Sequence, residues 1–219
     1  DGAYVTYPLG DLLRLLALES ARAKAIVVAE DLGTVPPGFC ERLTRAGVAG
    51  MRVLWFERDR KRFRQPAAWR PEAVALTSTH DLPTVAGWWR GADLRALAGV
   101  GHLDRKAFRD AQAKRGADRK ALWQAFRRAK LVGPTVPGAT SSARAVSAAL
   151  RFVGRSASRL ALIPLEDALG QVEQPNLPGT IEEHPNWRRR LAQPVDRILR
   201  QPAVRRRLQG LRPGGKEGA

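Results

Sequence analysis

Short runs of apolar residues alternate with amphipathic segments along this chain, and this alternation restricts the possible folds more than any other feature. The runs cover residues 25–29, 51–56, 73–77 and 160–163. A short, continuous apolar run is typical of a strand that is buried on both faces. Strands that alternate with helices form right-handed βαβ units. We therefore predict an α/β fold with a parallel sheet in which these four strands are adjacent in chain order.

The segments between these runs carry the signals of helices. Leucines recur at spacings of three and four residues, which predicts an amphipathic helix over residues 11–24. A second helix is expected to begin near Thr34, a candidate N-cap, with proline in its first turn, and to stop at Gly47. A longer helical stretch is expected over residues 92–130, where glycines interrupt a sequence rich in Ala, Arg and Lys.

Composition and element order predict five parts. These are residues 1–91, with three strands and their helices; 92–138, a helical insertion and a Gly/Pro-rich link; 139–170, a helix capped by Ser141 or Ser142 and the last strand; 171–211, a closing segment; and 212–219, a tail with too few apolar residues to pack, which we expect to be disordered.

The net charge of +17 raises the question of nucleic-acid binding. Only seven of the 38 basic residues are Lys, and the arginines are spread along the whole chain in an Ala-rich background. The densest clusters, at 188–190 and 205–207, lie in a C-terminal segment with helical spacing, where basic residues usually form a solvated face. We therefore interpret the charge as a compositional bias and expect no nucleic-acid partner.

Other features bear on compartment and cofactors. Cys40 is the only cysteine, which rules out an intrachain disulfide and suits a reducing, cytoplasmic environment. No run approaches the 18 or so apolar residues of a membrane span. His102 and His184 lie far in sequence from any pair of acids, so we expect neither a metal nor another cofactor. The chain starts at Asp1 without a start signal, and we expect it to be part of a longer protein.

Acidic residues follow three of the predicted strands. Glu30 and Asp31 end the first run, Glu57 follows the second, and Asp81 follows the third. Ligand sites in parallel α/β folds form at the carboxyl ends of the strands, so these side chains should gather there. Paired carboxylates are what glycoside chemistry requires. Acids in these loops also commonly cap the following helix, and spacing alone does not decide between the two interpretations.

Six short motifs stand out along the chain. They are VVAEDLG at 27–33, GMRVL at 50–54, AWRPE at 68–72, THDLPT at 79–84, QPNLPGT at 174–180 and NWRR at 186–189. They resemble, in the same order, motifs of one enzyme family, the 4-α-glucanotransferases or amylomaltases. Each motif alone is weak, but together they cover nearly the whole chain. The chain resembles the C-terminal half of the long bacterial type.

The resemblance implies a fold and a mechanism. Members of the family are retaining enzymes on a (β/α)8 TIM barrel, with the nucleophilic Asp on strand four, the acid/base Glu on strand five and a stabilising Asp on strand seven. By resemblance, Glu30 is the acid/base and Asp81 the stabilising group. The nucleophile's motif, an Arg followed two residues later by Asp-His-Phe, is absent. The chain should therefore supply strands 5–8, a helical insertion and a C-terminal helical segment, and be inactive alone on α-1,4-glucans.

Other residues are weaker candidates for substrate binding. They are His80, Asn176, Asp31, Glu57 and Asp59. His80 could instead make a structural hydrogen bond, Asn176 could be ordinary turn chemistry, and Asp31 could be a helix cap, which we favour slightly. Glu57 and Asp59 could line acceptor subsites or lie in solvent. Two other functions remain open: another amylase-like enzyme, such as a hydrolase or branching enzyme, and a basic nucleic-acid-binding protein.

Overall fold

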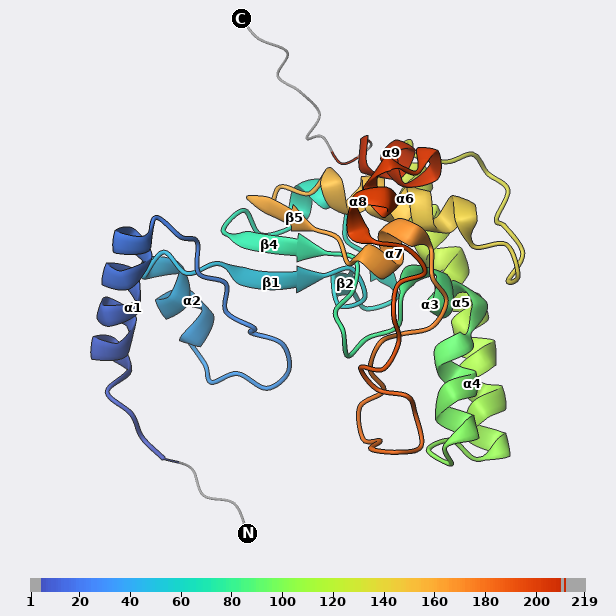
Figure 1. Cartoon of the computed structure of the whole chain (residues 1–219), viewed down its shortest axis with the longest axis horizontal. Helices are drawn as coiled ribbons and strands as arrows, with labels where there is room; N and C mark the ends of the chain where they lie inside the picture. Colours follow the sequence, from blue (N-terminus) through green and yellow to red (C-terminus); the bar gives the residue numbers. More distant parts are fainter. Residues whose placement is uncertain (1–4, 210, 212–219) are drawn as a thin grey trace, which may run out of the picture.

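A three-stranded parallel sheet forms the centre of the fold. The computed structural model describes residues 5–209 and 211. The strands β1 (Gly50–Val53), β4 (Ala73–Leu76) and β5 (Leu160–Leu162) lie in the order β1-β4-β5, and both pairings are parallel. All four residues of β4 are buried, as expected for the central strand. The predicted α/β fold with a parallel sheet is confirmed (Figure 1).

The first predicted strand is reduced to a single parallel bridge between Val28 and Ala49. Two backbone hydrogen bonds hold it beside β1, from Ala29 N–H to the Ala49 carbonyl (2.8 Å) and from Ala49 N–H to the Val27 carbonyl (3.0 Å). The segment lies beside β1, as predicted, but the prediction that residues 25–29 form a strand is wrong. Its outer edge has no strand partner within the described residues, so backbone hydrogen bonds hold only the side that faces β1.

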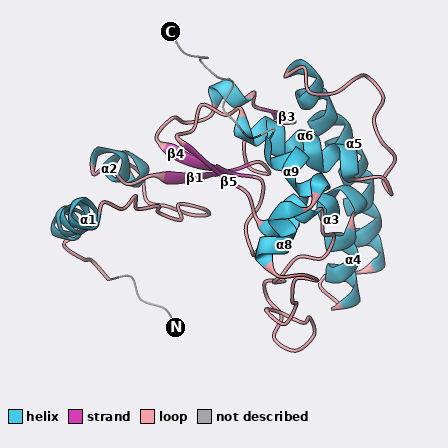
Figure 2. Cartoon of the chain, turned by 45° about the horizontal axis from the view of Figure 1, so that its top comes forward, coloured by secondary structure: helices cyan, strands magenta, loops and turns pink. Residues whose placement is uncertain are grey.

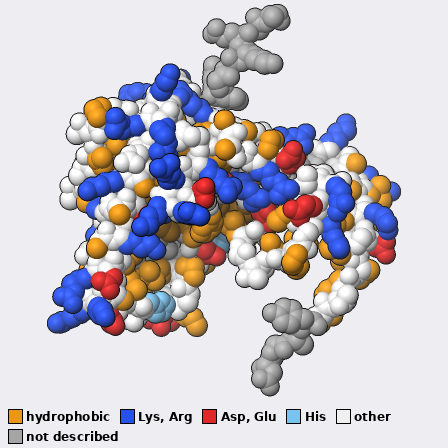
Figure 3. Space-filling model, turned by 180° about the vertical axis from the view of Figure 1, so that it is seen from behind, with side chains coloured by type: hydrophobic (Ala, Val, Ile, Leu, Met, Phe, Trp, Pro, Cys, Tyr) orange, Lys and Arg blue, Asp and Glu red, His pale blue; other side chains and the backbone are white. Residues whose placement is uncertain are grey.

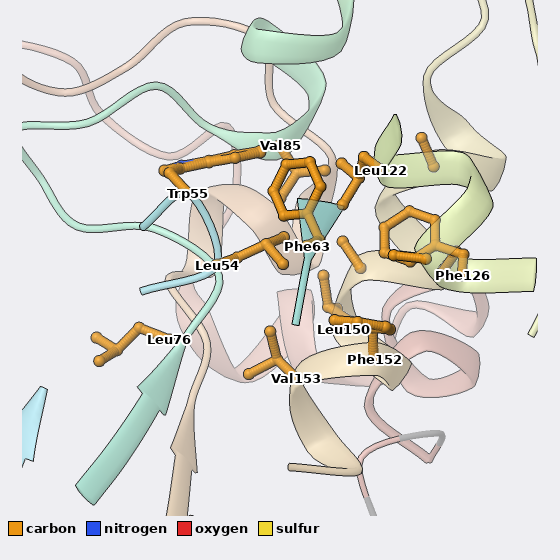
Figure 4. Close-up of a cluster of buried hydrophobic side chains, with 14 of the residues drawn as sticks. Leu54, Trp55, Phe63, Leu76, Val85, Leu122, Phe126, Leu150, Phe152 and Val153 are labelled. Carbon is orange, nitrogen blue, oxygen red and sulfur yellow. The ribbon is translucent and has the colours of Figure 1, made fainter. Parts of the chain in front are cut away.

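Three helices enclose the main core, and the last of them also contacts β4, the central strand. They are α3 (Val85–Arg90), α5 (Arg105–Arg128) and α6 (Ala143–Gly154). The core contains Trp88 and Trp89, which are both buried, and Trp88 stacks on Trp55 at 4.7 Å between ring centroids. Figure 4 shows how aromatic and aliphatic side chains from these helices and from the sheet interlock. This packing fixes α3, and with it the loop that precedes α3.

The helical stretch after α3 is a hairpin of two helices. The shorter helix, α4 (Ala92–Gly99), packs against the long helix α5. Asp104 caps α5, because its carboxylate accepts a hydrogen bond from Ala107 N–H at 2.7 Å. Figures 1 and 2 both place this hairpin at the end of the molecule opposite α1 (Leu9–Ala23) and α2 (Phe39–Arg45).

Two boundaries near the sheet differ from prediction. The second helix begins at Phe39, not near Thr34, because Gly38 adopts a left-handed conformation (φ 75°) that a helix cannot include. The strand predicted over 51–56 ends at Val53, and a turn leads into an unpredicted antiparallel hairpin of β2 (Arg58–Asp59) and β3 (Arg62–Phe63).

The C-terminal part is made of short helices. They are α7 (Leu165–Leu169), α8 (Val195–Arg200) and α9 (Pro202–Gln209), and a 3-10 turn, η1 (Pro66–Ala68), lies earlier in the chain. A small second core of Ala168, Ile198 and Val204 holds these helices together. The arginine cluster at 205–207 lies in α9 as expected, whereas the cluster at 188–190 lies in a loop. The predicted disorder of residues 212–219 falls outside the described residues.

Some apolar surfaces of the fold remain uncovered. No residue of α1 is buried, and all three residues of β5 are exposed. Leu162 of β5 is 50% exposed and Ile26, beside the other edge of the sheet, is 58% exposed.

Lys and Arg side chains are distributed widely over the face seen in Figure 3. No helix in the described part of the chain has the length and apolar character to cross a membrane.

Candidate active site

The loop after β4 carries the polar residues Ser78 to Asp81, and its ends are firmly held. Buried Ser78 donates a hydrogen bond from its hydroxyl to the Pro83 carbonyl at 2.8 Å. At the far end Thr84 caps α3 by accepting a hydrogen bond from Gly87 N–H at 2.9 Å. The loop therefore presents its polar side chains from a rigid base at the carboxyl end of the sheet.

Two adjoining cavities meet at this loop. One, of about 310 Å³, is lined by Glu30, by His80 and by apolar residues of the sheet. The other, of about 290 Å³, is lined by His80 together with Trp187 and Arg189 from the C-terminal part. The two cavities share Ser78, Thr79, His80 and Pro164, and we call them together the cleft. Glu30 and His80, 50 residues apart in the sequence, thus face the same space.

Asp81 adjoins the cleft through its neighbours. Its carboxylate accepts a hydrogen bond from the Asn176 side-chain amide at 2.6 Å, and His80 Nε2 lies 3.4 Å from its other oxygen. Its side chain is 45% exposed, so a ligand has access to it. Neither Asp81 nor Glu30 caps a helix, because the N-caps of α3 and α2 are Thr84 and Gly38. The alternative reading of these two acids as caps is wrong.

Asn176 sits in a loop that is fixed by side-chain hydrogen bonds. Gln174 donates to the Asn176 carbonyl at 2.6 Å, and Asn186 accepts from Leu177 N–H at 2.9 Å while donating to Thr180. The structure therefore brings Asn176, His80 and Asp81 together, although they come from segments about 95 residues apart.

Trp187 lines the cleft, although the sequence analysis assigned it no role beyond its place in the NWRR motif. Its backbone is left-handed (φ 59°), an unusual conformation for a bulky residue. Its N–H donates to the Pro175 carbonyl at 3.1 Å, and its side chain is exposed. The ring lies 5.2 Å from the His80 ring, between centroids. The available signal in the sequence was an aromatic residue within a motif of otherwise polar residues.

Asp31 has a structural role that differs from the helix cap we favoured. Its carboxylate is buried and accepts hydrogen bonds from Met51 N–H (2.7 Å) and from the Arg52 guanidinium (3.1 Å). A side chain at Gly50 would collide with it, since an added Cβ would lie 2.6 Å from Asp31 Oδ2. Asp31 thus ties the Glu30 segment to β1 and lines neither cavity of the cleft.

Glu57 and Asp59 lie outside the cleft. Glu57 is buried, not in solvent, with Arg52 and Arg64 at 3.9 and 4.0 Å. Burial raises the pKa of its carboxyl above the usual range, and the two arginines oppose this shift. Asp59 is exposed in the β2–β3 hairpin. Neither residue lines the cleft as this chain forms it.

Asp167, at the start of α7, is a residue that the sequence reasoning missed. It is fully buried and accepts hydrogen bonds from the Thr77 hydroxyl (2.5 Å) and Val85 N–H (2.6 Å). These two residues flank the loop that carries His80 and Asp81, so Asp167 holds both ends of that loop. Burial raises the pKa of Asp167 to about 6, although both hydrogen bonds favour the ionised form.

This raised pKa predicts a pH dependence of stability. The folded protein binds the Asp167 proton more tightly than the unfolded chain, in which the pKa of this carboxyl is near 3.8. Protonation of Asp167 therefore stabilises the fold. This stabilisation is fully present below pH 3.8 and is lost as the pH rises through about 6. Asp167→Asn should remove this loss, which is on the order of 3 kcal/mol at most. Asp167→Ala should destabilise at every pH by about 1–3 kcal/mol, because Val85 N–H loses its acceptor.

Denaturant unfolding of the protein, followed by Trp fluorescence between about pH 4 and 8, tests this expectation. Stability curves for Asp167→Asn and the unmodified protein that run parallel across this range would contradict the assignment.

Comparisons with known proteins identify the family of this chain. A model of the 4-alpha-glucanotransferase family matches residues 1–196. The chain belongs to this family. It is 40% identical over 196 residues to a 4-alpha-glucanotransferase of Mycobacterium tuberculosis (strain ATCC 25618 / H37Rv), a match covering 86% of this chain and 26% of the relative. A 4-alpha-glucanotransferase of Haemophilus influenzae is 32% identical over 209 residues, covering 94% of this chain and 30% of the relative.

The fold of this chain is also similar to that of a solved structure. The crystal structure of amylomaltase from Corynebacterium glutamicum superposes with a TM-score of 0.82 at 25% identity, covering 95% of this chain and 32% of that one. The resemblance seen in the motifs is thus confirmed. The chain spans between a quarter and a third of the length of these relatives.

Proposed function

We propose that this chain supplies the acid/base and the stabilising carboxylate of a retaining 4-alpha-glucanotransferase. The observation that carries the proposal is the cleft. Glu30 and His80 line one cavity at the carboxyl end of a parallel sheet, and Asp81 adjoins His80. Glycosidases place two carboxyl groups within about 5–10 Å of each other around one sugar. Asp81 lines neither cavity itself, and its contact with His80 is what places it beside the space that Glu30 faces.

The sheet supports an assignment to strands 5–8 of a (β/α)8 barrel. The Val28 segment, β1, β4 and β5 are adjacent and parallel in that order. Both outer edges are open in the described chain, and apolar side chains lie exposed beside them. A closed barrel has no such edges. We propose that a preceding half of the same polypeptide closes the barrel and brings the nucleophile.

We propose that the division expected from the sequence also holds. Residues 1–91 and 139–170 then contribute to the barrel half, residues 92–138 form the helical insertion, and residues 171–211 close the cleft from the C-terminal side. The contact between Asn176 and Asp81 supports a role of the last segment at the site.

The proposed reaction is a double displacement. A carboxylate outside this chain attacks the anomeric carbon of an α-1,4-glucan, while Glu30 gives its proton to the leaving glycosidic oxygen. The covalent glucanyl intermediate then reacts with the 4-hydroxyl of an acceptor glucan or glucose. Glu30, now ionised, takes the proton of that hydroxyl. The anomeric configuration is inverted twice and is therefore retained.

Asp81 and its neighbours act on the reacting sugar. We propose that Asp81 accepts hydrogen bonds from the sugar 2- and 3-hydroxyls, which strengthen as positive charge develops on the ring in the transition state. The hydrogen bond from Asn176 fixes one Asp81 oxygen and leaves the half-exposed carboxylate otherwise available. His80 contacts the same sugar from the shared wall of the cleft.

Trp187 provides an apolar face on which a glucose ring can stack. Trp187→Ala in the full-length gene product should raise KM for maltotriose roughly 2- to 10-fold with little change in kcat, because stacking contributes about 0.5–1.5 kcal/mol to ground state and transition state alike. Trp187→Phe keeps an aromatic ring, so its KM should lie between those of the unmodified protein and Trp187→Ala. Steady-state kinetics decide, and an unchanged KM in Trp187→Ala would remove the stacking role.

The activity is tested by incubating maltotriose with the full-length gene product and with the 219-residue chain alone. The full-length protein should produce glucose and maltodextrins longer than maltotriose on thin-layer chromatography. The chain alone should produce neither, because it lacks the nucleophile. A hydrolase would yield glucose and maltose without longer products, and robust transfer by the chain alone would contradict the placement of the nucleophile.

A further inference from the structure

A separate cavity of about 610 Å³ lies between α3, α4, α5 and the segment before α6. Four arginines line it, together with two neutral polar side chains and a few small or apolar residues. The lining is Arg90, Gly91, Leu94, Arg95, Gln112, Arg115, Arg119, Ala139 and Thr140. None of these residues lines the cleft that contains Glu30 and His80. We call this cavity the arginine pocket.

Arg115 forms the fixed wall of the arginine pocket. It is buried and makes a two-pronged salt bridge to Asp93, at 2.8 and 2.6 Å. It also donates to the Trp88 carbonyl at 2.6 Å and lies 4.6 Å from the centroid of the Trp88 ring. This charge is thus neutralised and held in place.

The other three arginines have no such neutralising partner. Arg90 Nε donates to the Ser142 hydroxyl (3.2 Å), Arg95 donates to the Arg90 carbonyl (3.0 Å), and Arg119 donates to the Trp89 carbonyl (3.0 Å). No carboxylate lies within 4.0 Å of these three guanidinium groups in the part of the chain that the structure describes. Burial, followed by the charge of Arg115, lowers the pKa of Arg119. The positive charge of these three arginines is therefore not compensated by a nearby carboxylate among the described residues.

We propose that the arginine pocket binds a small organic phosphomonoester. Guanidinium groups offer paired N–H donors that match phosphate oxygens, and a dianion would offset the charge that the three arginines leave unbalanced. Each arginine is already anchored through one neutral acceptor, so its remaining N–H groups are oriented before a ligand arrives. The pocket has the volume of a small-molecule site, far more than phosphate alone occupies. Gln112 and Thr140 can bind hydroxyls of the organic part, and Leu94 supplies an apolar contact.

The simpler interpretation is a solvated basic surface, as we inferred for the arginine clusters at 188–190 and 205–207. Two features distinguish this pocket from such a surface. Three arginines from different elements converge on one hollow, and each is fixed by a specific hydrogen bond to a carbonyl or hydroxyl oxygen. Charges on a solvated face need neither arrangement.

Calorimetric titration of the full-length gene product tests the proposal, with glucose 6-phosphate, AMP, inorganic phosphate and glucose as probes. At least one phosphomonoester should bind more tightly than inorganic phosphate, and glucose should not bind here. Arg95→Gln and the double variant Arg95→Gln/Arg119→Gln should weaken that binding, by about ten-fold or more for each arginine removed. Arg109→Gln, an exposed arginine of α5 outside the pocket, should leave it unchanged.

The single variant guards against misfolding, because Arg95 is exposed and its removal leaves the core intact. Equal affinity of Arg95→Gln and the unmodified protein for every phosphomonoester would overturn the proposal. So would the absence of binding, equal affinity for inorganic phosphate, or an equal loss in Arg109→Gln. Maltotriose transfer is measured in parallel, so that failure of this site is distinguished from failure of the catalytic assignment.

Discussion

Glu30→Gln in the full-length gene product should slow the disproportionation of maltotriose by about 10²- to 10⁴-fold, the usual contribution of general acid–base catalysis. Gln keeps the size and shape of the side chain but cannot release a proton to the leaving oxygen or accept one from the acceptor. Glu30 is exposed and its side chain makes no hydrogen bond or ion pair within the described residues, so the fold should not suffer.

Glu41→Gln is a matched control for this variant. Glu41 is an exposed residue of α2 that does not line the cleft, so its replacement should leave the transfer rate unchanged. Product formation from maltotriose is followed by chromatography at several times for each protein. A Glu30→Gln enzyme with the rate of the Glu41→Gln enzyme would exclude Glu30 as the acid/base.

Asp81→Asn should lower kcat by about 10²- to 10³-fold with a small effect on KM, by analogy with the loss of one charge-stabilising group in other enzymes. The amide cannot supply the negative charge that strengthens hydrogen bonds to the sugar as its own positive charge develops. It also faces the Asn176 amide, whose hydrogen bond to the carboxylate must rearrange.

Asn176→Ala separates these two effects. It removes the contact that orients Asp81 but leaves the carboxylate, so it should reduce kcat much less than Asp81→Asn does. Steady-state kinetics with maltotriose give both constants. A raised KM with an unchanged kcat in Asp81→Asn would mean that Asp81 binds the ground state only.

The sheet could be read from the sequence wherever a strand is buried on both sides. The first four residues of the run at 73–77 are apolar, and they become β4, the central strand. The run at 25–29 is also apolar, but it pairs on one side only within the described residues and forms a single bridge. An apolar composition indicates that a strand is suited to burial, but it does not show whether the neighbouring strands lie within the same chain.

The site could be predicted in part. Ser78 to Asp81 were found because strand ends are where ligands bind, and this rule depends on local order along the chain. The roles of Asp31 and Asp167 depend on partners 20 to 90 residues away, Met51 for the first and Thr77 and Val85 for the second. No local pattern encodes such contacts. For the same reason the arginine pocket, which α3, α4 and α5 build together, was read as dispersed charge.

The role of Glu30 is tested most directly with a donor whose leaving group needs no proton. α-Maltotriosyl fluoride releases fluoride without acid assistance, so Glu30→Gln should release a first equivalent of fluoride at close to the unmodified rate, while its reaction with maltotriose stays slow. A fluoride electrode follows this release in the full-length gene product. Rapid release followed by slow turnover would show that Glu30 supplies the proton and later removes one. An equal loss with the fluoride and with maltotriose would contradict the account.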